Sequence, residues 1–105
     1  NGKQKKPYLY LDDLIDAMKY YNINHKNLLV NVSPLDEGIT VEEIVEMTLG
    51  KVSSDVEVYY ELQEEGWQGD VVKYSYDIAL QNKLGWKPKY SSSEAIEKTI
   101  EATFD

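Results

Sequence analysis

The clearest structural signal in this sequence is a helix start at Thr40. Glu43 follows three residues later, so the two side chains can each accept a backbone amide across the first turn in a capping box. Ile39 and Ile44 occupy the two positions of a hydrophobic staple around that start. Gly50 then stands where a left-handed residue would end the helix. The pattern predicts an amphipathic helix over about 41–49.

Ser91 and Glu94 form a second capping box, which predicts a terminal helix. Residues 77–84 predict a shorter helix before it, ended by Gly85. Near the start of the chain, Asp12 stands at a helix cap. The apolar residues around it recur at helical spacing and predict a buried face, made of Leu11, Leu14, Ile15, Met18 and Tyr21.

Three short runs rich in branched and aromatic residues predict strands, over 8–11, 28–32 and 56–60. The predicted order is strand, helix, strand, helix, strand, helix, helix. With 105 residues, 42% of them hydrophobic, the chain has the size and composition of one domain. We therefore expect a single small mixed α/β (α+β-like) domain over residues 1–105.

Charge and composition exclude several classes of function. Nineteen acidic against eleven basic residues give a net charge of −8, which repels nucleic-acid phosphates and anionic lipid. All eleven cations are lysine, so no arginine fork is available to grip a phosphate. There is no cysteine and no signal-peptide pattern, which fits a cytoplasmic protein. His25 has no second ligand nearby, so no metal site is expected.

Several passages, taken in order, resemble the NAD-dependent nucleotide-sugar epimerases and dehydratases of the extended short-chain dehydrogenase/reductase family. Residues 6–13, Lys-Pro-Tyr-Leu-Tyr-Leu-Asp-Asp, are similar to the family's basic-residue, aromatic, "[YH]-V-x-D" segment. Residues 29–32 and 39–44 are similar to "F-N-V-G…T-V-x-E-I". Gly69-Asp70 and residues 84–88, Leu-Gly-Trp-Lys-Pro, are similar to "P-G-D…L-G-W-x-P". The shared order spans essentially the whole chain.

The resemblance implies a parent enzyme that oxidises a nucleotide-activated sugar transiently with bound NAD. Two of the family's defining features have no counterpart here. None of the six glycines follows the dinucleotide-binding spacing, and none of the nine tyrosines has a lysine four residues on. The chain therefore resembles the carboxy-terminal, substrate-binding portion, with no catalytic and no cofactor-binding residue of its own. Its expected partners are a nucleotide-sugar and the missing N-terminal Rossmann half, and a homo-oligomer is possible.

The resemblance also implies three substrate-binding residues. Lys6 stands where the family has an arginine that reaches the substrate diphosphate, and it supplies charge without the planar fork. Asp70 matches the aspartate that touches the nucleoside, and a carboxylate can accept two ribose hydroxyls. Trp67 replaces an arginine and offers a ring for stacking on a base or sugar instead. A surface role for Lys6 and a core or lid role for Trp67 are the alternatives.

A second interpretation keeps the same small-domain fold without an enzyme. In it, the chain is a stand-alone binding or interaction module. The resemblance covers epimerases, dehydratases and reductases alike, so it leaves the sugar, the nucleotide and the reaction outcome open.

Overall fold

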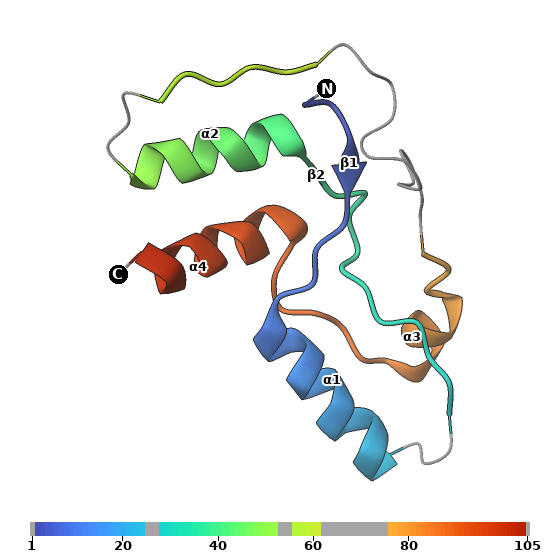
Figure 1. The fold of residues 1–105 in the computed structure, drawn as a ribbon. Coiled ribbons are helices and arrows are strands. Elements are labelled where there is room, and N and C mark those ends of the chain that lie inside the picture. Colours follow the sequence, from blue (N-terminus) through green and yellow to red (C-terminus); the bar gives the residue numbers. More distant parts are fainter. Residues whose placement is uncertain (1, 25–27, 53–55, 62–75, 105) are drawn as a thin grey trace.

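The computed structural model describes residues 2–24, 28–52, 56–61 and 76–104, and has a mixed α/β fold. Two strands, β1 (Lys5–Lys6) and β2 (Ile39–Thr40), form a short antiparallel ladder. The described residues also form four helices: α1 (Leu11–Asn24), α2 (Val41–Lys51), α3 (Ala79–Leu84) and α4 (Ser92–Phe104). Helices α2 and α4 lie side by side at one end, and α1 extends away from them (Figure 1). No Rossmann fold is present in the described part of the chain.

Both predicted capping boxes are confirmed. The amide of Thr40 donates to the Glu43 carboxylate at 2.7 Å, and the amide of Glu43 donates to the Thr40 hydroxyl at 3.1 Å. Ser91 and Glu94 exchange the corresponding bonds at 3.1 and 3.2 Å before α4. Because these boxes satisfy first-turn amides locally, the sequence alone determines where both helices begin.

Of the two helix ends predicted at glycine residues, the structure confirms the one at Gly85 and not the one at Gly50. Gly85 ends α3 with φ +90°, and its amide donates to the Gln81 carbonyl at 3.2 Å, as predicted. The predicted stop at Gly50 is wrong, because α2 continues through Gly50 to Lys51 and ends at Val52 in extended backbone. A helical glycine costs about 1 kcal/mol relative to alanine but does not forbid the helix.

The sheet lies elsewhere than predicted. Residues 8–11, 28–32 and 56–60 belong to no ladder in the described part of the chain, while Lys5 pairs with Thr40 and Lys6 with Ile39. Instead of joining a strand, the amide of Tyr8 donates to the Ser92 hydroxyl at 3.0 Å. The three strand predictions are therefore wrong, because branched and aromatic residues alone carry no information about which segments pair.

The predicted buried face of α1 is also wrong. Four of its five residues are exposed, with Leu11 62%, Leu14 38%, Ile15 41% and Met18 63% accessible to solvent, while Tyr21 is half-buried beside Trp86. Buried instead are Asp13 and Ala17. Asp12 is not the cap, since α1 begins one residue earlier at Leu11. The helix thus has its apolar side outward and a polar side inward.

Gly38 shapes the entry to β2. Its φ is +122°, a value that L side chains rarely adopt, and a Cβ there would overlap the backbone of Lys6 and lie 2.6 Å from the amide nitrogen of Pro7. Only glycine lets the two chain segments approach closely enough to form the β1–β2 ladder.

We predict opposite effects for two glycine substitutions. Gly38→Ala should lower the free energy of unfolding by about 2 kcal/mol or more, because it combines backbone strain with a steric overlap. Gly50→Ala, the matched control, meets nothing within 4 Å in a helix and should raise stability by about 0.5–1 kcal/mol. Urea unfolding followed by circular dichroism measures both. Equal effects of the two changes would contradict the structure.

Candidate functional site

Of the three substrate-binding residues implied by the sequence, the structure places Lys6. It lies in β1, half-buried, opposite Ile39 of β2. Asp70 and Trp67 lie outside the described residues, as does His25. The substrate-binding roles of Lys6, Asp70 and Trp67 therefore stay predictions. Among the described residues, no group of three His, Asp or Glu side chains has a metal-binding arrangement.

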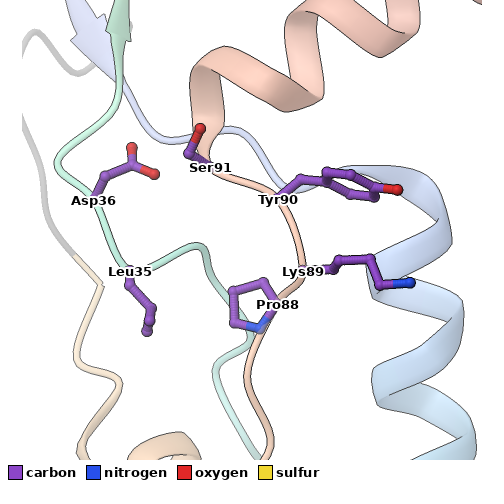
Figure 2. Close-up of a pocket in the computed structure, with 6 residues that line it drawn as sticks. All are labelled: Leu35, Asp36, Pro88, Lys89, Tyr90 and Ser91. Carbon is purple, nitrogen blue, oxygen red and sulfur yellow. The ribbon is translucent and has the colours of Figure 1, made fainter.

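A depression of about 320 Å³ opens between the loop that precedes β2 and the loop that precedes α4. Figure 2 shows its lining: Leu35, Asp36, Pro88, Lys89, Tyr90 and Ser91. The side chains of Lys89 and Tyr90 point away from Asp36, toward α1 (Figure 2). The polar groups facing the hollow are thus the Asp36 carboxylate and the Ser91 hydroxyl, beside the apolar Leu35 and Pro88. Both groups are already hydrogen-bonded, since the Asp36 carboxylate accepts the Ser92 amide and the Ser91 hydroxyl accepts the Glu94 amide.

Asp36 is bonded into the start of α4. The amide of Ser92 donates to its carboxylate at 2.9 Å, and the buried Ser92 hydroxyl, which accepts the Tyr8 amide, also donates to it. Partial desolvation raises the pKa of the Asp36 carboxyl, but the hydrogen bonds from Ser92 and from the amides of Gly38 and Asp36 outweigh that effect. The pKa is lowered overall. Asp36 therefore holds the β2 loop against α4 as an anion.

A second carboxylate joins α1 to the loop beneath the depression. Asp13 is 4% exposed, and its two oxygens accept the amides of Lys89 and Tyr90, each at 3.0 Å. One turn further along α1, the indole of Trp86 donates to Asp16 at 2.9 Å. Another turn on, the Tyr20 hydroxyl donates to the Leu84 carbonyl at 2.6 Å. A polar stripe of α1 thus fixes the course of residues 84–90.

The side chain of Gln81 in α3 bonds to the backbone of Ser33 as a neighbouring strand would. Its side chain is fully buried, accepts the amide of Ser33 at 2.9 Å and donates to the Ser33 carbonyl at 2.9 Å. One side-chain amide thus satisfies both backbone groups of Ser33, directly after the segment 28–32 that was predicted as a buried strand. This bond also sets the loop that carries Leu35 and Asp36.

Backbone amides at the starts of α2 and α4 are already hydrogen-bonded within the chain. At α2, the amides of Val41 and Glu42 donate to the carbonyls of Gln4 at 3.0 Å and Gly2 at 2.7 Å, and the Glu43 amide is held by the capping box. At α4, the amides of Ser92 and Glu94 are held by Asp36 and by the Ser91 hydroxyl. A dinucleotide pyrophosphate needs such amides unoccupied.

Asp13, Asp36 and Gln81 hold distant segments of the chain together, and the sequence did not predict this role for them. Asp13 carried a signal, because residues 13, 16, 17 and 20 recur at helical spacing just as the apolar stripe does. Asp36 and Gln81 carried none, since their partners lie 56 and 48 residues away along the chain.

Comparison with known proteins gives one informative similarity. The chain is 27% identical over 100 residues to a protein of Methanocaldococcus jannaschii named "Putative UDP-glucose 4-epimerase". The similarity covers 95% of this chain but 31% of that protein. No family model matches the chain. The chain is thus similar to about one third of an epimerase-type protein.

No helix among the described residues combines the length and the apolar composition needed to cross a bilayer.

The bonds at Asp36 predict a pH dependence. Because the pKa of the folded carboxyl lies below its ordinary value of 3.8, its stabilising effect is complete well above that value and is lost as the pH falls through the lowered folded value. We expect the stability difference between the wild type and Asp36→Asn to be constant from pH 7 to about 5 and to shrink below about 4. Urea unfolding across that range measures it, and a difference that does not change with pH would contradict the assigned bonds.

Proposed function

We propose that this chain is the substrate-side portion of an NAD-dependent nucleotide-sugar epimerase or dehydratase and is not catalytic alone. The observation that carries the proposal is the alignment of 100 residues with part of the protein named "Putative UDP-glucose 4-epimerase". The ordered family-like passages agree with that alignment, because they extend from residue 6 to the terminal helix.

In this proposal Lys6 supplies positive charge to the substrate diphosphate. Its strand position favours the role, since a residue in the β1–β2 ladder is held on a fixed backbone. A lysine acts as a point charge, so it tolerates a wider range of phosphate positions than an arginine fork would. The fixed backbone restricts where that charge lies.

Asp70 would accept the ribose hydroxyls, and Trp67 would stack on the base or the sugar. Charge-assisted hydrogen bonds from two hydroxyls give the carboxylate both affinity and orientation. An aromatic ring contributes apolar contact area on a ring face while leaving the ligand's polar edge free. Together the three residues would recognise phosphate, ribose and ring, which are the three parts of a nucleoside diphosphate sugar.

NAD and the hydride-transfer chemistry belong, in this proposal, to a Rossmann half of the parent protein. When bound there, NAD would accept and return the hydride of a sugar hydroxyl. Lys6, Asp70 and Trp67 would bind and orient the nucleotide-sugar, while the hydride and proton transfers would belong to the Rossmann half.

Titration of the isotope-labelled chain with UDP-glucose tests the proposal by NMR. The chain has two tryptophans, and their indole resonances provide a built-in comparison. The Trp67 indole should shift saturably. The Trp86 indole should stay in place, because it is 3% exposed and bonded to Asp16.

Two variants with matched controls sharpen the experiment. Asp70→Asn should weaken UDP-glucose binding about tenfold and Lys6→Gln about fivefold, through loss of charge-assisted bonds, while Lys3→Gln at the exposed turn should change it little. Titrations with ADP-glucose and with UDP separate the contributions of the base, the phosphates and the sugar to the binding free energy. Absence of any saturable shift with UDP-glucose, or saturable binding of NAD to this chain, would overturn the proposal.

A further inference from the structure

The backbone of Lys6 is constrained from both sides of the residue. Lys6 pairs with Ile39 in the β1–β2 ladder. Gly38 lies so close to Lys6 that a Cβ there would overlap the Lys6 carbonyl. Pro7 follows directly, and a residue before proline is confined to extended backbone. Together these constraints fix the point at which the Lys6 side chain leaves the ladder.

A further constraint on this segment comes from Ser92 at the start of α4. The Ser92 hydroxyl is fully buried and accepts the amide of Tyr8 at 3.0 Å, across 84 positions of the chain. The same hydroxyl donates to the Asp36 carboxylate, which also accepts the Ser92 amide at 2.9 Å. Figure 2 shows the Asp36 side chain directed toward the start of α4. One hydroxyl thus joins the segment after β1 to the loop before β2 and to α4.

The two bonds of this hydroxyl depend on each other. A serine hydroxyl has one donor hydrogen, and the Asp36 carboxylate takes it, so the oxygen lone pairs stay available to the Tyr8 amide. Because the acceptor is an anion, the bond from the hydroxyl is charge-assisted and stronger than a neutral one. The Tyr8 amide is therefore anchored to a hydroxyl whose own orientation is fixed.

The neighbouring Lys5 lies in different surroundings. Successive residues of a strand face opposite sides of the ladder, so Lys5 and Lys6 do not share a face. Lys5 is exposed and lies near the Glu43 carboxylate of α2: hydrogen bonds from Thr40 lower the pKa of the Glu43 carboxyl, and the charge of Lys5 lowers it further. Lys6, which is half-buried, is the lysine adjacent to the segment that Ser92 anchors.

We propose that Ser92 is a positioning residue for the diphosphate contact, because by anchoring the backbone at Tyr8 it sets where the Lys6 ammonium group meets the substrate. This role rests on the proposed function, in which Lys6 supplies the charge toward that diphosphate. Ser92 is fully buried, so it acts through Lys6 and not by touching the substrate. A lysine side chain is flexible, and a fixed backbone therefore reduces the conformational freedom that binding would otherwise have to remove.

A double-mutant cycle on UDP binding tests this role. UDP is titrated by NMR into the wild type, Ser92→Ala, Lys6→Gln and the double variant. The dissociation constants are taken from resonances of the folded chain, so a partly unfolded variant does not distort them. Ser92→Ala should weaken UDP binding about threefold, and should have no further effect once Lys6 is glutamine. Thr103→Ala, the matched control, removes a hydroxyl that donates within α4 and should bind UDP as the wild type does.

Asp36→Asn is a second variant, and it decides the question if Ser92→Ala does not fold. It removes the negative charge of the acceptor that orients the Ser92 hydroxyl, so it should weaken UDP binding about twofold, again only when Lys6 is present. UDP binding that is absent in the wild type, or unchanged by Lys6→Gln, would overturn the proposed function and the role of Ser92 with it. UDP binding that depends on Lys6 but is unchanged in both second-site variants, or is weakened by the same factor with and without Lys6, would overturn the role of Ser92 alone.

Discussion

The bond between the Asp13 carboxylate and the amides of Lys89 and Tyr90 is the constraint on which the rest of the structure depends. It joins residues 76 and 77 positions apart and fixes α1 against the loop that leads into α4. From there the contacts continue through Ser92 to Asp36 and the β2 loop. The described part of the chain is thus held largely by side-chain-to-backbone hydrogen bonds, with few fully buried apolar residues: Ala17, Ile39, Trp86 and Ala95.

This construction explains why α1 has its apolar side outward. In a small domain with few buried apolar residues, buried hydrogen bonds contribute a larger share of the free energy of unfolding, provided that every donor and acceptor has a partner. Asp13, Asp16 and Tyr20 each accept or donate one or more bonds to residues 84–90, and they leave the opposite side of the helix without an internal partner.

Local signals in the sequence predicted the helices and not the sheet. Thr40 with Glu43, and Ser91 with Glu94, satisfy amides within one turn, so the residues that fix each helix start are adjacent in the sequence. Strand pairing and burial depend on distant residues. Two sides of α1 have residues at the same helical spacing. Hydrophobicity alone favoured burial of the apolar side, but the structure buries the side that carries Asp13 and Ala17. The role of Gln81 depends on Ser33, which no local pattern indicates. Lys6 was located, while Asp70 and Trp67 lie outside the described residues.

Amide hydrogen exchange at Lys89 and Tyr90 tests the central bond most directly. The structure predicts that both amides, although they lie in a loop, exchange as slowly as the buried residues of α1 in the wild type. In Asp13→Ala both should exchange many-fold faster, while the capped amides of α2 change less. Exchange at Lys89 and Tyr90 in the wild type as fast as in an unstructured peptide would contradict the account.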